Sequence, residues 1–377
     1  MLDNFINPQF SKNLFVLLKP TDMCNLRCKY CFQKPKEYKA TVLSEEILKK
    51  FCDITFSHYE RITIVFHGGE PTLVGEEKIR KYINIIRSKQ KDFMIKLKFA
   101  MQTNGTCLND SFVRYLKSEQ VGVGISFDGL HNDATRGQTK QVLDCLSLFK
   151  NNNFKVGVIT VVCDKNCNDL IENYEYMKKE KINFQISAFE NTISTSDIRL
   201  DVDNFIFRMG ELFDYWCEDE KCNISVNPFE QIIMSIIKGY STQCARSSCL
   251  KWWICLEPNG DVTPCDRIFP KEFCYGNIKD LYDIRQIYKS EGFLRLIKGS
   301  VARRQRCAEE CDIYQYCEGG CNNQALYEVG LENNNGPSCK IFRNLFHKIN
   351  KFLTETNISN IKNPRLKKIL EEVRSAK

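Results

Sequence analysis

Short apolar runs alternate with amphipathic stretches along the first 190 residues of the chain. Strands of this nearly continuous apolar character, rich in Val, Ile and Phe, are typical of parallel sheets whose two faces are both covered. The pattern therefore predicts six parallel strands. They cover residues 14–21, 62–69, 97–104, 121–129, 155–162 and 182–189.

Between these runs, apolar residues recur at helical spacing. In residues 44–56, Ser44 suits the N-cap position, and Ile47, Leu48 and Phe51 fall on one helical face. Six strand–helix units in succession predict an α/β fold in which a parallel sheet curls into a barrel or partial barrel. The other helices predicted between strands cover residues 76–89, 110–120, 139–152 and 168–180.

The alternation of strand and helix patterns stops after residue 190. A hairpin is predicted with Asn259-Gly260 as its turn, but from residue 240 onward we expect few regular elements and a basic tail at the end. Further helices are predicted over residues 202–216, 228–239 and 339–353. We expect three domains: a barrel with its following helices (1–235), a cysteine-rich domain (240–345), and a C-terminal helix and tail (346–377).

Composition is ordinary for a globular protein, with 43% apolar and 27% charged residues among 377. The N-terminus lacks the basic start and apolar block of a signal peptide, and no run reaches the roughly 18 apolar residues of a membrane helix. We therefore predict a cytoplasmic protein without a membrane partner. The net charge of +7 is interspersed along the chain, which favours a solvated surface over a nucleic-acid-binding stripe.

Cysteine is the informative residue type, because the chain has 20 and no export signal. Disulfides are rare in the cytosol, so metal or redox chemistry is favoured over a disulfide framework. Cys24, Cys28 and Cys31 follow the first predicted strand, where a parallel barrel carries its active site. A structural zinc site needs four ligands. Three thiolates on a [4Fe–4S] cluster instead leave one iron open to a small molecule.

The spacing C-x3-C-x2-C after a first strand resembles the signature of the radical S-adenosylmethionine (SAM) superfamily. This resemblance implies a partial (β/α)6 barrel and a [4Fe–4S] cluster whose open iron binds the amino and carboxylate groups of SAM. It also implies cleavage of SAM to methionine and a 5′-deoxyadenosyl radical that abstracts hydrogen from the substrate. A zinc knuckle built from the same cysteines is the alternative.

Three further loops resemble those that contact SAM in this superfamily: "GGEP", "QTNG" and "SFDG", each after a successive strand. His67, just before the first of them, is interpreted as a packed or hydrogen-bonded side chain. By the resemblance, the SAM-binding residues are Gly68, Gly69, Glu70, Pro71, Gln102, Asn104, Ser126, Asp128 and Arg136.

The C-terminal cysteines resemble the ladder of a SPASM domain, which carries two auxiliary [4Fe–4S] clusters and would bring the total to three. The chain departs from that ladder because three residues, not two, separate Cys307 and Cys311. Two zinc sites with the same ligands are the alternative. The resemblance assigns Cys249, Cys265, Cys321 and Cys244 to the first auxiliary cluster, with Cys255 as second choice for the fourth ligand. It assigns Cys307, Cys311, Cys317 and Cys339 to the second.

Radical SAM enzymes with this extension are similar to one another in modifying peptides or proteins. Asp266 follows Cys265 as in anaerobic sulfatase-maturating enzymes, which oxidise Cys or Ser to formylglycine. The resemblance implies that Asp266 is the catalytic base, with a role in holding the cluster loop as the alternative. The chain departs from that subgroup at His67, where Gln is expected, and at Gln33, where Tyr is usual.

These departures favour an oxidoreductase that matures a ribosomally made peptide, giving an oxidised or cross-linked side chain; sulfatase maturation is the alternative. The expected partners are a precursor peptide or small protein, a one-electron donor such as flavodoxin or ferredoxin, and a separate leader-binding protein. The leader-binding protein is expected to be separate because only about a dozen residues precede the first predicted strand, too few for a leader-binding domain. Non-enzymatic alternatives are an iron–sulfur electron carrier or a zinc scaffold. RNA modification is disfavoured because no base-stacking module is appended.

Overall fold

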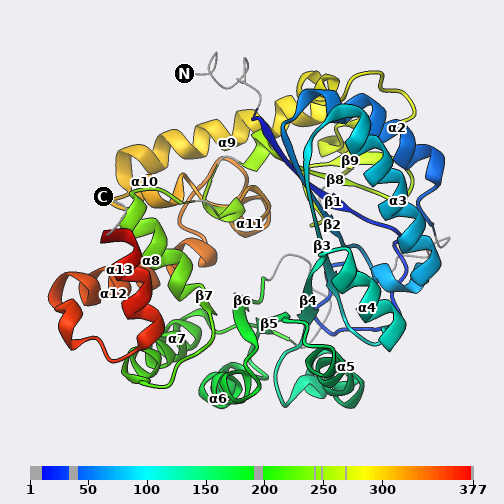
Figure 1. Cartoon of the computed structure of the whole chain (residues 1–377). Coiled ribbons are helices and arrows are strands. Elements are labelled where there is room, and N and C mark those ends of the chain that lie inside the picture. Colours follow the sequence, from blue (N-terminus) through cyan, green and yellow to red (C-terminus); the bar gives the residue numbers. More distant parts are fainter. Residues whose placement is uncertain are drawn as a thin grey trace.

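The computed structural model of the chain has one curved parallel sheet with helices on its outer face, which confirms the predicted α/β fold (Figure 1). It describes residues 11–33, 41–190, 198–241, 243–247, 249–267 and 270–374. Six strands follow one another in chain order, each parallel to the next. They are β1 (Asn13–Leu18), β2 (Arg61–Phe66), β3 (Lys96–Thr103), β4 (Gly122–Ser126), β5 (Gly157–Val162) and β6 (Asn183–Ala188).

One helix follows each of the first five strands, and together these helices cover the outside of the sheet. The predicted cap is present, since the Ser44 side chain accepts a hydrogen bond from the backbone of Ile47. These helices are α2 (Glu45–Thr55), α3 (Glu76–Phe93), α4 (Asp110–Ser118), α5 (Thr139–Asn151) and α6 (Leu170–Glu180).

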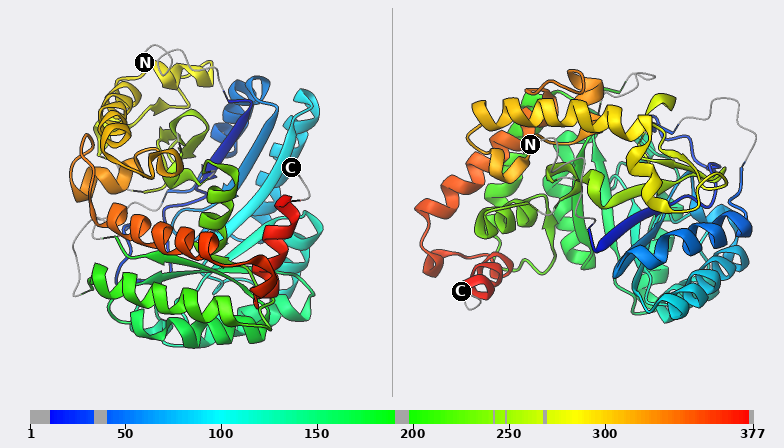
Figure 2. Two further views of the ribbon diagram at one scale, coloured as in Figure 1. Left: turned by 90° about the vertical axis from the view of Figure 1, so that its left-hand side faces the viewer. Right: turned by 90° about the horizontal axis from the view of Figure 1, so that it is seen from above.

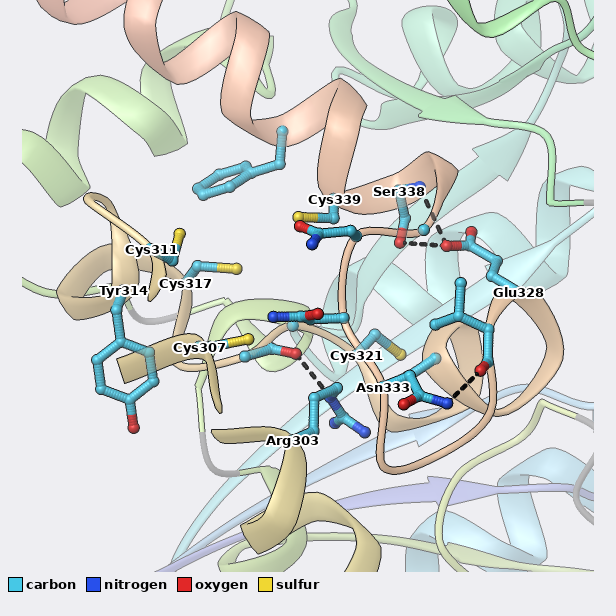
Figure 3. A pocket seen from close by; sticks show the side chains of 18 of the residues that line it. Arg303, Cys307, Cys311, Tyr314, Cys317, Cys321, Glu328, Asn333, Ser338 and Cys339 are labelled. Carbon is cyan, nitrogen blue, oxygen red and sulfur yellow. Dashed lines mark hydrogen bonds between the residues drawn. The ribbon is translucent and has the colours of Figure 1, made fainter. Parts of the chain in front are cut away.

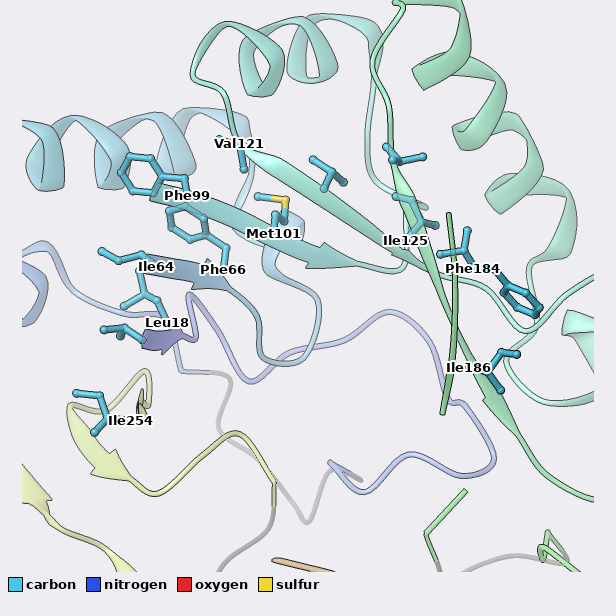
Figure 4. Packing of buried hydrophobic residues seen from close by; sticks show 14 of the residues in the cluster. Leu18, Ile64, Phe66, Phe99, Met101, Val121, Ile125, Phe184, Ile186 and Ile254 are labelled. Atoms are coloured by element: carbon cyan, nitrogen blue, oxygen red, sulfur yellow. The ribbon is translucent and has the colours of Figure 1, made fainter. Parts of the chain in front are cut away.

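The main core lies between the sheet and these helices. Phe66, Phe99 and Ile125 are among the buried side chains that point from the strands toward the helices (Figure 4). The alternate residues of the strands, among them Gln102 and Ser126, are only half-buried. The inner face of the sheet therefore carries polar side chains, which the apolar pattern of the strands did not predict.

Four short strands extend the sheet at its two ends. β8 (Trp253–Leu256) pairs in parallel with β1, β9 (Asp261–Thr263) returns antiparallel to β8, and β10 (Gly276–Asn277) follows. β7 (Val226–Asn227) adds to β6. The predicted hairpin is confirmed, and it attaches the cysteine-rich part directly to the barrel sheet. The three predicted domains remain a prediction, and the boundary after residue 345 falls inside a helix.

The expectation of few regular elements after residue 240 is wrong. α9 (Glu291–Glu310) has 20 residues, and the predicted basic tail contains α13 (Pro364–Arg374). α9 carries the buried side chains of Arg303 and Arg304, which interrupt the apolar stripe that a sequence pattern would detect. The remaining helices are α7 (Val202–Glu218), α8 (Phe229–Lys238), α10 (Tyr314–Cys317), α11 (Asn322–Glu328) and α12 (Pro337–Glu355).

Helix α12 packs against α7 and α8, so the end of the chain lies beside the last strands of the barrel (Figure 2). α9 runs across the upper left of the view, above α11 (Figure 1). Among the described residues, no helix combines the length and the apolar character of a membrane span.

Candidate active site and iron–sulfur centres

Cys24, Cys28 and Cys31 lie in the loop that follows β1, and all 20 cysteines of the chain are free thiols. The pKa of Cys28 is raised to about 11, chiefly by burial. The positive charge of Arg136 opposes this shift, whereas the neighbouring Cys31 and Cys24 add to it. The loop therefore brings the three thiols close to one another and to the guanidinium group of Arg136. A shared cluster needs the three thiols to be close in this way.

The sulfur atoms of Cys24, Cys28 and Cys31 do not all lie within 4.8 Å of one another. Tetrahedral zinc ligands are separated by about 3.8 Å when each sulfur lies about 2.3 Å from the metal. Among the described residues, the one group of three metal-binding side chains with ligand atoms within 4.8 Å is His131, Asp169 and Glu172, which contains no cysteine.

The glycine pair after β2 packs against the cysteine loop. A Cβ atom on Gly69 would lie 2.0 Å from the carbonyl oxygen of Met23, and one on Gly68 would lie 2.6 Å from that of Thr21. The Glu70 N–H donates to the Met23 carbonyl at 2.7 Å. These glycines are needed because two loops meet without side chains between them, and not only for an approach to SAM, as the motif suggests.

Glu70 connects the second and third loops. Its carboxylate is 1% exposed and accepts hydrogen bonds from the backbone and hydroxyl of Thr72, from the Thr103 hydroxyl at 2.6 Å and from the Asn104 N–H at 2.7 Å. Pro71 is buried and begins a short 3-10 helix behind it. Protein donors thus occupy both oxygens, and the SAM contact predicted for Glu70 remains a prediction. Thr72 was not predicted, because it follows the "GGEP" motif, and Thr103 was not singled out within "QTNG".

Asn104 and Gln102 hold the neighbouring loops. Asn104 Nδ2 donates to Asn25 Oδ1 at 2.9 Å and lies 4.0 Å from Cys24 Sγ, so it fixes the cysteine loop from the end of β3. Gln102 Nε2 donates to Ser126 Oγ at 2.7 Å on the inner face of the sheet. Two predicted SAM-binding side chains are therefore brought together.

Tyr30, between two of the cysteines, reaches Asp128 and Arg136. Asp128 accepts hydrogen bonds from the Tyr30 hydroxyl at 2.5 Å and the Thr135 hydroxyl at 2.6 Å. Burial raises the pKa of Asp128, while Arg136 and these hydrogen bonds lower it. Arg136 donates to the Tyr30 oxygen at 2.8 Å. Asp128 thereby positions Tyr30 across the site.

Arg136 also has a buried Nε with no hydrogen-bond partner among the described residues. Buried donors are rarely left unpaired, and a guanidinium N–H pairs well with a carboxylate. The unpaired Nε beside the three thiols therefore fits the carboxylate of SAM, the group that the family resemblance assigns to Arg136.

Asp266 stands at the junction of the barrel and the cysteine-rich part. Its Oδ2 lies 3.3 Å from His67 Nδ1, although the two are not aligned for a hydrogen bond. The Asp266 carbonyl accepts from Gln33 Nε2 at 3.3 Å and from Lys19 Nζ at 3.5 Å. The two residues that depart from the sulfatase pattern, His67 and Gln33, therefore both contact the predicted base.

Lys19 forms a buried pair with Glu257 at 2.7 Å. Burial alone would lower the pKa of Lys19, but the charges of Cys255, Glu257 and Asp266 outweigh it and raise the pKa. Cys255 Sγ lies 3.6 Å from Glu257 Oε1. Cys255 thus belongs to this charged group at the end of β1.

The thiols assigned to the first auxiliary cluster lie near one another. Burial raises the pKa of Cys265, and Asp266, Cys321 and Cys249 raise it further. Local desolvation, followed by the nearby Cys321, raises the pKa of Cys244 to about 11, although this residue is exposed at the surface. This grouping supports Cys244 over Cys255 as the fourth member, and ligation itself remains a prediction.

The thiols assigned to the second auxiliary cluster line one cavity, with Cys321 also on its wall (Figure 3). The unusual spacing of Cys307 and Cys311 has a simple explanation. The N–H of Cys311 donates to the Cys307 carbonyl at 2.9 Å at the end of α9, so the two thiols are one helical turn apart and on the same face. The other two members of this set are Cys317 and Cys339.

Two buried arginines lie among these thiols. Arg303 is 1% exposed, donates from Nε to the Gly319 carbonyl at 2.8 Å, and has its pKa lowered to about 10 by burial and by Arg304. Arg246 lies 3.7 Å from Cys317 Sγ. Buried cations need compensating negative charge, and anionic clusters supply it. No sequence motif indicated either arginine.

Comparison with known proteins agrees with this geometry. Residues 18–177 match the family model of the radical SAM superfamily. The chain therefore contains a radical SAM domain. Its radical SAM domain implies a [4Fe–4S] cluster and SAM as cofactors.

This chain is similar to anaerobic sulfatase-maturating enzymes. It is 25% identical to the cysteine-type anaerobic sulfatase-maturating enzyme of Clostridium novyi, over 89% of this chain and 95% of that protein. It is also 25% identical to the serine-type enzyme of Bacteroides thetaiotaomicron, over 83% of each chain. These relatives favour the sulfatase-maturating alternative over the ribosomal-peptide interpretation that His67 and Gln33 suggested.

The fold of the whole chain matches a solved structure, anSMEcpe with bound AdoMet and Cp18Cys peptide. The TM-score is 0.80 at 23% identity, and the match covers 91% of this chain and 98% of that one. The partial barrel with a cysteine-rich extension is therefore confirmed as the fold.

Proposed function

We propose that the protein oxidises a Cys or Ser side chain of a protein substrate to formylglycine under anaerobic conditions. The observation that carries the proposal is the position of Asp266. Its carboxylate adjoins Cys265 in sequence and lies 3.3 Å from His67, which directly precedes the glycine pair beside the cysteine loop. A base at this junction faces both the predicted SAM site and the predicted auxiliary centre.

The proposed cofactors are SAM and three [4Fe–4S] clusters. When bound, they supply the radical that removes a hydrogen atom from the substrate Cβ and the acceptor for the electron that leaves next. The substrate must also lose the proton of its thiol or hydroxyl group. Asp266 accepts that proton, and a positioned carboxylate of this kind contributes roughly 10²- to 10⁴-fold to a rate. A Ser substrate thereby becomes the aldehyde directly, whereas a Cys substrate becomes a thioaldehyde, which water converts to the aldehyde with release of hydrogen sulfide.

The residues around Asp266 orient it for this step. Gln33 and Lys19 donate hydrogen bonds to its backbone carbonyl, which leaves the carboxylate available to the substrate. Arg136 offers its unpaired Nε to the SAM carboxylate. Gln102, Asn104 and Ser126 are further proposed SAM contacts, with the backbone of Gly68 and Gly69.

The cluster ligands follow from the three groups of thiols. Cys24, Cys28 and Cys31 hold the SAM-binding cluster. The auxiliary clusters take Cys244, Cys249, Cys265 and Cys321, and Cys307, Cys311, Cys317 and Cys339. A one-electron donor such as flavodoxin or ferredoxin is the partner that this chemistry requires.

The proposal is tested with reduced, anaerobically reconstituted protein, SAM, and peptides from bacterial sulfatases that carry Cys or Ser at the modified position. Formation of an aldehyde, trapped with a hydrazine, is the expected result. If SAM is cleaved but neither peptide gains an aldehyde, the formylglycine assignment is wrong.

A second candidate is maturation of a ribosomally made peptide, with a separate leader-binding protein. It is supported by His67 and Gln33, since both residues that differ from the sulfatase pattern contact the proposed base. The same incubation with a precursor peptide separates the two. A cross-linked product without an aldehyde supports this candidate.

A further inference from the structure

Arg246 is a buried cation that stands between the two groups of auxiliary thiols. It follows Cys244 by two residues in a short 3-10 helix, and its side chain lines the same cavity as the four thiols assigned to the second auxiliary cluster. Only 8% of Arg246 is exposed. A charged side chain is rarely buried to this extent unless another group pairs with its charge.

A carboxylate is not that partner. Among the residues that the structure describes, no Asp or Glu side chain forms an ion pair with Arg246, whose polar contact is with a thiol. Glu328 lies on the same cavity wall, but its carboxylate accepts two hydrogen bonds from Ser338. The neighbouring buried Arg304, in contrast, pairs with Glu318 at 3.2 Å. The charge of Arg246 therefore calls for an anion in the cavity.

A thiol and an aromatic ring hold the guanidinium group in place. Arg246 Nη1 donates to Cys317 Sγ at 3.7 Å, and the guanidinium carbon lies 4.2 Å from the centre of the Phe342 ring, within the range of a cation–π contact. A Cβ atom on Gly320 would lie 3.3 Å from the same Nη1. The ring and the glycine thus leave the guanidinium group one narrow place, directed at the Cys317 sulfur.

We infer that Arg246 raises the reduction potential of the second auxiliary cluster by donating to the Cys317 thiolate that binds it. The potential of an iron–sulfur cluster depends on its net charge, on hydrogen bonds to its sulfurs and on its exposure to solvent. Reduction adds one negative charge, which a buried cation stabilises more than a cation in water does. The inference rests on the proposed function, since that proposal assigns the cluster to these thiols.

A raised potential favours this cluster as an acceptor for the electron that leaves the substrate. In that step the substrate radical loses one electron and gives one proton to Asp266, and the auxiliary clusters gain the electron. An electron carrier of the flavodoxin or ferredoxin type then removes it before the next turnover. Arg246 acts on this transfer through Cys317, so it is a positioning residue and touches neither SAM nor the substrate.

The test is a redox titration of the anaerobically reconstituted holoenzyme without substrate, followed by electron paramagnetic resonance. Wild type, Arg246→Met and Arg246→Lys are compared. Arg343→Met is the matched control, because Arg343 also lies near thiols of the second group but is partly exposed and pairs with Asp312. We expect Arg246→Met to lower the ratio of reduced to oxidised cluster at a given potential by about tenfold, which is about 59 mV for a one-electron couple.

Arg246→Lys keeps the charge but lacks the planar donor fork, so we expect a smaller shift in the same direction. An unchanged potential in Arg246→Met, or an equal shift in Arg343→Met, would overturn the inference. Iron analysis shows whether each variant holds all its clusters. If Arg246→Met does not, the Lys variant decides, and a wild-type potential there would overturn the inference. Incomplete clusters in both variants would assign Arg246 to cluster assembly and reject its role in the potential.

These outcomes are distinct from failure of the proposed function. The potential is measured without turnover, so the shift can be found even if no aldehyde forms on sulfatase peptides. Conversely, aldehyde formation together with an unchanged potential in Arg246→Met would leave the proposed function standing and reject the role of Arg246. A wild type without a second auxiliary signal would show that the proposed cofactors are wrong, and the inference would fall with them.

Discussion

His67 Nδ1 lies 3.3 Å from Asp266 Oδ2, and this contact joins the end of β2 to the loop after β9. Both residues are next to predicted cofactor positions, His67 before Gly68 and Asp266 after Cys265. The barrel and the cysteine-rich part therefore meet at a carboxylate, where substrate, SAM and an auxiliary cluster would converge.

Replacing Asp266 by Asn keeps its size and removes its ability to accept a proton. We expect peptide oxidation to fall by roughly 10²- to 10⁴-fold while 5′-deoxyadenosine still forms, because SAM binds elsewhere. Product and 5′-deoxyadenosine are quantified in the same reaction. An unchanged rate of product formation would remove Asp266 from the role of base.

His67 is expected to position Asp266. His67→Ala should lower kcat for the peptide by about tenfold, with little change in its KM, because the carboxylate loses a neighbour at 3.3 Å. His67→Gln restores a polar side chain and is expected to recover most of the rate. If the Ala and Gln variants behave alike, His67 has only a packing role.

Separate substitutions of Cys244 and Cys255 test which of the two thiols is a ligand of the first auxiliary cluster. We expect Cys244→Ala to lose the iron of one cluster, about a third of the total, because its thiol groups with Cys321. Cys255→Ala should retain all the iron, because Cys255 contacts Glu257 instead. Iron and sulfide analysis of both variants, reconstituted in parallel, decides the assignment. The reverse pattern would transfer the ligand role to Cys255.

Gly69 is predicted to be intolerant of any side chain. Gly69→Ala would place a methyl group 2.0 Å from the Met23 carbonyl, so we expect destabilisation by about 1–3 kcal/mol and poor assembly of the N-terminal cluster. Gly122→Ala is the control, since its added methyl would make only ordinary contacts beyond 3.7 Å. Thermal unfolding and iron content measure both effects. Equal stability of the two variants would contradict the close loop contact.

Much of the barrel could be predicted from the sequence because its strands are apolar and separated by amphipathic helices. β2, for example, was expected over residues 62–69 and is observed at Arg61–Phe66. α9 could not be predicted in this way, because Arg303 is buried on a face that a pattern search expects to be apolar. Its burial makes sense only once the thiols around it are known.

The site also contains features that could be predicted from the sequence and features that could not. The spacing of Cys24, Cys28 and Cys31 along the chain is enough to indicate a cluster. The contact of His67 with Asp266 could not be foreseen, because it joins residues far apart in the chain across two parts of the fold. The role of Gly69 was also only partly predictable, since a sequence motif does not reveal which neighbour comes close.

The most direct test of the account is isotope transfer from the substrate. A sulfatase peptide with deuterium at Cβ of the target Cys is incubated with reduced holoenzyme and SAM, and the 5′-deoxyadenosine is analysed by mass spectrometry. Deuterium is expected in the 5′-deoxyadenosine together with an aldehyde on the peptide. Failure to form 5′-deoxyadenosine with intact clusters, or an aldehyde formed without deuterium transfer, would contradict it.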